Sequence, residues 1–267
     1  MNVELVVIDP QNDFCDPTGS LFVPGADEDM KRLAEFVRVR GKLLSDINIT
    51  LDSHHTVDVA HPCFWVDQSG KNPPPFTLVS AQDVANGIWI PSVPSKNIRD
   101  RMKQYVQDLE DSGRYPLCIW PPHCLIGSWG NNIYPELFEA FTAWEIENFA
   151  TLATVTKGSN PFTEHYSAVK AEVPDPKDST TQLNISFIDK LKECDIILIA
   201  GEALSHCVAN TFVDIANEFG DDSYIAKLVL LRDACSNVTG FDNLGDKFIK
   251  DMTARGMQIS STVDFTF

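Results

Sequence analysis

Short runs of apolar residues alternate along this chain with longer segments in which apolar residues recur at helical spacing. The first run, residues 3–8, is bounded by turn residues, as is typical of a buried strand. Residues 27–45 place Leu33, Phe36 and Val37 on one face, as is typical of an amphipathic helix. The same reasoning predicts strands at 3–8, 47–51, 117–120, 149–156, 195–200, 224–231 and 257–260, and helices at 27–45, 98–111, 132–145, 182–192, 204–219 and 243–254.

This alternation predicts an α/β fold with a central, mostly parallel sheet and helices on both of its faces. We expect a single domain over residues 1–267. Residues 66–116 are predicted to be an insertion, and its first part, 66–97, is rich in proline, glycine and polar residues and is expected to be irregular. A second long loop is expected at 158–180. Long loops within compact domains are often functional.

The charge balance narrows the classes of partner. The chain has 21 basic and 38 acidic residues, which gives a net charge of −17. A protein that binds nucleic acid or an anionic membrane surface needs positive charge to neutralise phosphate. No apolar run approaches the ~18 residues of a membrane span. We therefore expect neither nucleic acid nor membrane as a partner.

The cysteines favour a reducing compartment. There are seven of them, scattered and without a Cys-x-x-Cys pair. The N-terminal segment lacks the basic region of a signal peptide and has the pattern of the first core strand. We expect a cytoplasmic protein with reduced thiols.

Three reactive side chains follow three of the predicted strands. Asp9 follows the strand 3–8, Lys157 follows the strand 149–156, and Cys207 lies in the first turn of the helix after the strand 195–200. The carboxyl ends of parallel strands share one edge of the sheet, where open α/β folds build their sites. The unpaired N–H groups at the start of the helix favour a thiolate at Cys207.

These side chains suit acyl transfer at an amide. Cys207 would attack the carbonyl carbon, and Asp9 would take the thiol proton and later give it to the departing ammonia. Lys157 would stabilise the thiolate and keep Asp9 ionised. The backbone N–H groups of Ala203 and Cys207 would form an oxyanion hole. Each residue alone has a structural interpretation, as a buried small side chain, a cap or a solvated cation; their coincidence at strand ends points to catalysis.

A second group of residues is typical of a metal site. Asp52 and His54 are two residues apart at a strand end, so their side chains point to the same side. His61 lies seven residues after His54, and His123 comes from a separate segment. Mixed oxygen and nitrogen donors suit zinc, iron or manganese. The alternative interpretation is that these histidines form hydrogen bonds within turns.

Taken together, the segments resemble the nicotinamidase branch of the isochorismatase-like cysteine hydrolases. The similarity rests on residues 7–14 (VIDPQNDF), 52–54 (DSH) with His61, 120–127 (WPPHCLIG), 156–158 (TKG) with Tyr166 and Ser167, and 201–208 (GEALSHCV), in that order. The resemblance implies a three-layer α/β sandwich around a parallel sheet. It also implies hydrolysis of nicotinamide to nicotinate and ammonia through a thioester on the cysteine.

The resemblance further implies a divalent metal, with zinc expected before iron or manganese, that contacts the pyridine nitrogen of the substrate. Its implied ligands are Asp52, His54 and His123, and some members of the family add a histidine at the position of His61. A cis peptide before Ala203 is implied as well. The expected partner is a small-molecule amide, and we expect a homo-oligomer.

Aromatic side chains near the motifs are expected to wall a ring-shaped substrate, namely Phe14, Trp120 and Tyr166. Glu202 departs from the family pattern, because simple nicotinamidases tend to have an apolar residue at this position. We expect Glu202 to be buried near the metal or the substrate, or to pair with a cation. Two alternatives stay open: a same-fold cysteine hydrolase of another amide, such as a carbamoyl or ureido substrate, and a non-catalytic member that binds a metal or ligand.

Overall fold

A six-stranded parallel sheet forms the centre of the computed structural model, which describes residues 1–266. The strand order is β10-β9-β8-β1-β2-β7, and every neighbouring pair is parallel. The expected parallel sheet is confirmed. Its strands are β1 (Val3–Ile8), β2 (Asp46–Asp52), β7 (Ala153–Lys157), β8 (Ile196–Gly201), β9 (Leu228–Leu231) and β10 (Gln258–Ser260).

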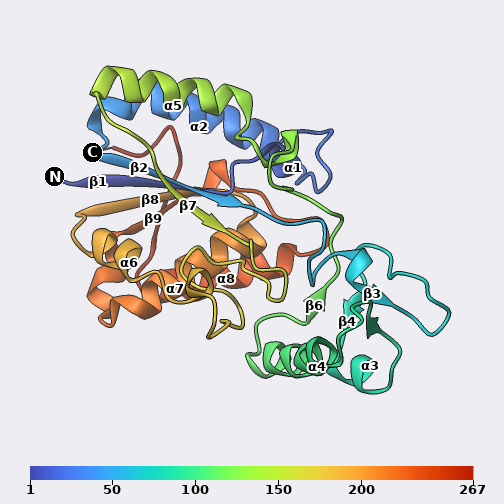
Figure 1. Cartoon of the computed structure of the whole chain (residues 1–267). Helices are drawn as coiled ribbons and strands as arrows, with labels where there is room; N and C mark the ends of the chain where they lie inside the picture. The colour runs from blue at the N-terminus through green and yellow to red at the C-terminus, as the bar shows by residue number, and fades with distance from the viewer. Residues whose placement is uncertain (267) are drawn as a thin grey trace.

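Helices cover both faces of this sheet (Figure 1). One layer holds α2 (Ala26–Arg40) and α5 (Pro135–Asn148), and the other holds α6 (Ile185–Lys192), α7 (Ala209–Phe219) and α8 (Asp242–Arg255). All six residues of β1 are buried, because the strand is covered on both faces, and five of the six are apolar. The expected three-layer sandwich is confirmed. Among the described residues, no helix combines the length and the apolar character that crossing a bilayer requires.

The chain between β2 and α5 forms an excursion beyond the carboxyl ends of the strands (Figure 1). It contains the 3-10 turn Trp129–Asn131, which contacts the short helix α1 (Asn12–Cys15), and several short elements that contact one another. These are β3 (Trp65–Val66) paired with β5 (Ile90–Pro91), β4 (Leu78–Val79) paired with β6 (Leu117–Cys118), α3 (Ala81–Ala85) and α4 (Lys96–Asp111). The expectation of an irregular segment at 66–97 is therefore wrong in part. Strands of only two residues are too short to form an apolar run in the sequence, so these antiparallel pairs were not predicted.

Several predicted boundaries shift for identifiable reasons. The strand predicted at 149–156 begins only at Ala153, because Phe149 is fully exposed and adopts a left-handed conformation that ends α5. The strand predicted at 224–231 begins at Leu228, after the 3-10 turn Asp222–Lys227. Apolar residues in a turn have the same local pattern as a strand end, so periodicity alone places such boundaries poorly.

One short helix and one change of helix type were not predicted. Residues Asn12–Cys15 form the short helix α1 between the predicted strand 3–8 and the predicted helix 27–45. The helix predicted at 204–219 begins with the π-helical segment Leu204–Val208 before α7. Single-turn π segments inside helices often occur at functional sites.

We predict that Gly201 and Gly256 differ sharply in their tolerance of alanine, although their φ angles are nearly equal at +113° and +114°. A Cβ at Gly201 would lie 2.1 Å from the carbonyl oxygen of Ile8, whereas a Cβ at Gly256 meets nothing within 4 Å. Gly256→Ala should lower the free energy of unfolding by only about 1–2 kcal/mol, because a residue with a Cβ is strained in the left-handed conformation. Gly201→Ala should cost about 2 kcal/mol more, because β1 and β8 must separate.

Urea unfolding followed by circular dichroism measures both changes. Equal losses of unfolding free energy in the two variants would contradict the close approach of β1 and β8.

Candidate active site

The carboxyl ends of four neighbouring strands carry the candidate site. In the order β8-β1-β2-β7, Ile8 is paired with Gly201 and Asp52 is paired with Lys157. Asp9 follows β1 directly, and the turn that leads to Cys207 follows β8. The parallel register therefore brings together residues that are far apart in the sequence.

Lys157 is the centre of this arrangement. Its side chain is buried, with Nζ 2.8 Å from Oδ2 of Asp9 and 3.1 Å from Oδ1 of Asp52. The same nitrogen lies 3.6 Å from Sγ of Cys207. Burial lowers the pKa of Lys157, but Asp52 and Asp9 more than offset this and hold its pKa well above the usual range. Lys157 is therefore an ammonium in contact with both carboxylates and the sulfur.

Asp9 is held rigidly beside Cys207. It adopts a positive φ of 43° and its Oδ1 accepts a hydrogen bond of 2.5 Å from the hydroxyl of Thr50 on β2. Burial raises the pKa of Asp9, while the neighbouring Lys157 opposes that rise. A carboxylate with a raised pKa is a better proton acceptor.

The state of Cys207 differs from the sequence-based expectation. Burial raises the pKa of the Cys207 thiol well above its usual range, although Lys157 acts in the opposite direction. The sequence predicted that the start of the helix and Lys157 favour a thiolate; in the folded chain burial outweighs these effects on the pKa of Cys207, because loss of water disfavours the charged form. Cys207 therefore rests as a thiol, and its ionisation requires a nearby base.

The turn before Cys207 is tightly fixed. The peptide between Glu202 and Ala203 is cis, as the resemblance implied. The carbonyl oxygen of Ala203 accepts hydrogen bonds from the N–H groups of His206 (3.0 Å) and Val208 (3.1 Å). Ala203 and Cys207 both line the same pocket, where the sequence predicted an oxyanion hole.

Asp52, His54 and His123 form a compact cluster beside Lys157. Their possible ligand atoms lie within 4.8 Å of one another. Nε2 of His54 is 3.0 Å and Nε2 of His123 is 3.5 Å from Oδ2 of Asp52. Each imidazole uses Nδ1 for a second contact, His54 with Asp58 (3.1 Å) and His123 with the carbonyl of Pro121 (2.8 Å). Such outer contacts orient metal-binding imidazoles, so these residues fit a divalent metal.

His61 lies against this cluster. Its ring centroid is 5.4 Å from that of His54 and 5.7 Å from that of His123. Its Nδ1 contacts the carbonyl of Thr56, while its buried Nε2 has no hydrogen-bond partner within the described residues. Burial lowers the pKa of His61 to about 4. A neutral imidazole with an unused nitrogen fits a further ligand, although His61 lies outside the three-residue group.

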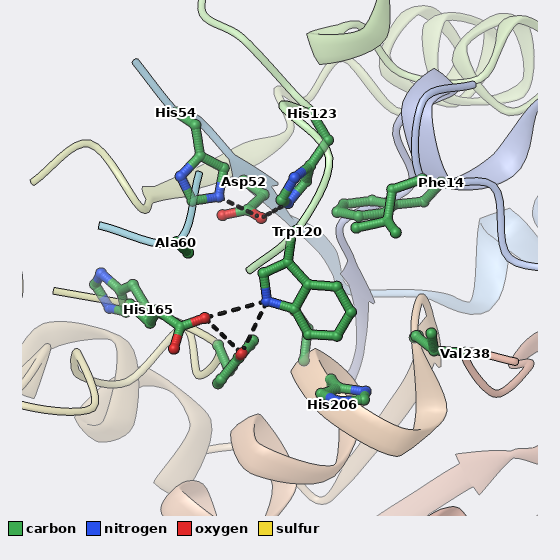
Figure 2. A pocket seen from close by; sticks show the side chains of 14 residues that line it. Phe14, Asp52, His54, Ala60, Trp120, His123, His165, His206 and Val238 are labelled. Carbon is green, nitrogen blue, oxygen red and sulfur yellow. Dashed lines mark hydrogen bonds and ion pairs between the residues drawn. The ribbon is translucent and has the colours of Figure 1, made fainter. Parts of the chain in front are cut away.

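One pocket is lined both by the cluster of Asp52, His54 and His123 and by Cys207, and Figure 2 shows the three cluster residues beside Trp120 and Phe14. Trp120 forms one wall, and its Nε1–H donates to Oε1 of Glu164 (3.2 Å) and to the hydroxyl of Tyr166 (3.1 Å). The ring of Phe14 lies 5.3 Å from that of His123. All three aromatic residues predicted as walls line the pocket, together with Asp52, His54, His123, Glu164, His165, Ala203, His206, Cys207 and others.

Three polar residues of this pocket, Glu164, His165 and His206, were not predicted from the sequence. Burial raises the pKa of Glu164 to about 8 and lowers that of His165 to about 3 and that of His206 to about 4. His206 could have been found, since it precedes Cys207 within the nucleophile motif. Glu164 and His165 lie in an irregular loop, where no local pattern marks them.

Glu202 does not lie where it was expected. Its side chain is fully buried and it does not line the pocket or join the metal cluster. Its Oε2 accepts a 3.1 Å hydrogen bond from the N–H of Ser236. The placement near metal or substrate is therefore wrong. The carboxyl instead lies behind the turn that carries Ala203, and the cation that acts on it is Arg232.

Comparison with curated proteins finds relatives of one kind. The chain is 25% identical to the nicotinamidase of Escherichia coli over 98% of this chain and 95% of that protein. It is 26% identical to the nicotinamidase of Acinetobacter baylyi over 96% of this chain and 91% of that protein. No family model matches the chain. The resemblance predicted from the sequence is confirmed.

Solved structures show the same fold. A nicotinamidase/pyrazinamidase from Acinetobacter baumannii superposes with a TM-score of 0.64 at 20% identity, over 98% of this chain and 96% of that one. Yeast nicotinamidase bound to the inhibitor nicotinaldehyde superposes with a TM-score of 0.63 at 18% identity, over 97% of this chain and 99% of that one. A pyrazinamidase of Pyrococcus horikoshii in complex with zinc superposes with a TM-score of 0.57 at 18% identity, over 98% of this chain and 99% of that one.

The geometry predicts that Lys157→Met lowers the free energy of unfolding by about 3–5 kcal/mol, because Asp9 and Asp52 lose their buried cation. Adding Asp9→Asn should recover part of this loss, since only one carboxylate then remains unpaired. Lys247→Met is the control: it removes an exposed pair with Asp251, and it should cost about 0.5 kcal/mol or less.

Urea unfolding in the presence of a chelator measures all three variants without a contribution from metal. A loss for Lys157→Met as small as that for Lys247→Met would contradict the buried ion-pair network.

Proposed function

We propose that this chain is a metal-dependent cysteine amidohydrolase that converts nicotinamide into nicotinate and ammonia. One observation carries the proposal: a buried ammonium, that of Lys157, contacts Asp9 and Cys207 and also Asp52 of the metal cluster. The curated relatives and the aromatic walls of the pocket support nicotinamide as the substrate.

The reaction proceeds in two halves. Asp9 accepts the thiol proton as the sulfur of Cys207 attacks the amide carbon. The N–H groups of Ala203 and Cys207 stabilise the oxygen of the tetrahedral intermediate. Asp9 then protonates the leaving nitrogen, so ammonia departs and a thioester remains. Water attacks the thioester with Asp9 as the base, which releases nicotinate and restores the thiol.

Lys157 keeps its proton throughout. Its charge stabilises the sulfur as it loses the proton, and it keeps Asp9 available as a base by opposing the effect of burial on the pKa of Asp9. Trp120 and Tyr166 hold the pyridine ring, and their mutual hydrogen bond fixes the two walls relative to each other.

The divalent metal would be held by Asp52, His54 and His123, with His61 as a further ligand. When bound, it supplies a Lewis-acid contact for the ring nitrogen of the substrate. The donor set suits zinc, and the zinc complex of the Pyrococcus horikoshii pyrazinamidase supports that metal. A cytoplasmic location is part of the same proposal, since all seven cysteines are free thiols. The predicted homo-oligomer stays a prediction.

Replacing the nucleophile tests the proposed chemistry. Cys207→Ala should lower ammonia release from nicotinamide by about 10⁴-fold or more, because no thioester can form. Folding and metal content should stay unchanged. Cys63→Ala is the matched control, since it removes an exposed thiol outside the pocket and should keep full turnover.

A coupled enzymatic assay for ammonia measures the rates. Equal activity in Cys207→Ala and the parent protein would exclude the mechanism. Absence of turnover in the parent protein, with Cys207 still readily alkylated, would exclude nicotinamide as the substrate and favour a cysteine hydrolase that acts on another amide.

Adjacent histidines offer a test of the metal site. His54→Ala should lose most of its bound metal on gel filtration, because it removes one nitrogen of the cluster. His55→Ala should retain the metal, because His55 is exposed and lies outside the cluster. Elemental analysis gives the ratio of metal to protein. A fully loaded His54→Ala variant would contradict the ligand assignment.

A further inference from the structure

The segment after β9 runs alongside the nucleophile turn and is bonded to it at three points. The N–H of Ser236 donates to Oε2 of Glu202 (3.1 Å), and the N–H of Leu204 donates to the carbonyl of Ser236 (2.8 Å). The N–H of Val238 donates to Oγ of Ser205 (3.1 Å). Residues on both sides of Ala203 are thus tied to one segment. The tie on the N-terminal side is made by a side chain, the carboxyl of Glu202.

A second carboxyl, that of Asp29 on α2, completes this arrangement. Asp29 is buried, its Oδ2 accepts a 2.5 Å hydrogen bond from the hydroxyl of Ser236, and its Oδ1 binds Arg32 at 2.5 Å. The carboxyls of Asp29 and Glu202 therefore meet at one residue, Ser236, whose hydroxyl donates to Asp29 and whose N–H donates to Glu202. Oε1 of Glu202 is buried and receives no hydrogen bond from the described residues. If Oε1 of Glu202 carries a proton and donates it to Asp29, it needs no donor of its own.

We propose that Glu202 is a positioning residue that shares one proton with Asp29 and, through Ser236, holds the N–H of Ala203 where the oxyanion of the acyl transfer forms. Glu202 does not line the pocket, so it acts only through the backbone. The inference rests on the proposed function for its catalytic consequence. It goes beyond the family resemblance, which gives no partner for a glutamate at this position.

Other charged groups surround Glu202. Arg32 faces Asp29 from α2, and Arg232 comes from the turn after β9. The thiols of Cys15 and Cys235 are buried nearby and interact with the carboxyl. Burial raises the pKa of Glu202 well above its usual range and Asp29 raises it further, whereas the Ser236 N–H and Arg232 lower it. The neutral acid is therefore the form that fits.

This protonation has a consequence for stability. The unfolded chain releases the Glu202 proton near its ordinary pKa of 4.5, whereas the folded chain keeps it. Folding then becomes less favourable as the pH rises from that value towards the raised pKa. Glutamine has the same shape and needs no proton, so Glu202→Gln should gain stability relative to the parent protein over this range.

Three variants separate positioning from general stability. Glu202→Gln keeps an oxygen for Ser236 and an N–H for Asp29. Glu202→Leu removes both interactions. Glu4→Leu is the matched control, since Glu4 is also a buried glutamate but lies near the start of β1, where it binds Lys190. For each variant, the experiment measures kcat and KM for nicotinamide, alkylation of Cys207 by iodoacetamide, inhibition by nicotinaldehyde, and Tm from pH 5 to 9.

Glu202→Leu should lower kcat by about 10–100-fold, because one oxyanion donor is displaced. KM and the alkylation rate should change by less than about threefold, since neither depends on an oxyanion. Inhibition by nicotinaldehyde should weaken in proportion to kcat, because its adduct with the thiol places an oxygen in the same position. Glu202→Gln should keep kcat near that of the parent protein, and Glu4→Leu should lower Tm without lowering kcat.

Two results would overturn the inference: a kcat for Glu202→Leu no lower than for Glu4→Leu, or a loss in Glu202→Gln as large as in Glu202→Leu. A Tm difference between Glu202→Gln and the parent protein that does not grow with pH would overturn the shared proton. If the parent protein releases no ammonia from nicotinamide, the proposed function fails, and the Tm series still decides whether Glu202 and Asp29 share a proton.

Discussion

Burial of one ammonium group determines how this site is built. Removing a lysine cation from water costs several kcal/mol, and the cost is offset only by close, well-oriented partners. Lys157 has such partners in Asp9 and Asp52, which lie at the ends of adjacent strands. Asp52 also contacts both His54 and His123. Cys207 and the cluster of Asp52, His54 and His123 therefore share a single network of charges, and neither can be arranged independently of the other.

The parallel register explains why this network can form. Asp52 and Lys157 are directly paired across β2 and β7, and Thr50 on β2 hydrogen-bonds to Asp9 after β1. The chain leaves β7 through Gly158, whose φ is +83°, and a Cβ there would lie 2.6 Å from Oδ1 of Asp52. Only a residue without a side chain lets the strand turn so close to a carboxylate. The sheet thus fixes the positions of the charged side chains, and the close approach of the chain to Asp52 requires glycine at position 158.

These features also show what a sequence can reveal. Asp9, Lys157 and Cys207 follow apolar runs, so the rule that parallel strands end at one edge was sufficient to predict that they meet. The pair formed by Asp29 and Glu202 could not be predicted, because Asp29 looks like an ordinary acidic residue in the first turn of a helix. Glu164 was missed for a similar reason: its partners, Trp120 and Tyr166, are fixed by tertiary packing rather than by local spacing.

Two buried carboxyls close to the nucleophile turn show how environment assigns roles. Burial raises the pKa of both Asp9 and Glu202. Beside Asp9 lies an ammonium that opposes this rise, so the group can exchange a proton during the reaction. Beside Glu202 lies a second carboxyl that adds to the rise, so the group keeps its proton. Carboxyls whose surroundings separate their protonation states in this way can serve as base and as fixed donor within one site. The same chemical group, a carboxyl, thus supplies proton transfer at Asp9 and a permanent hydrogen bond at Glu202.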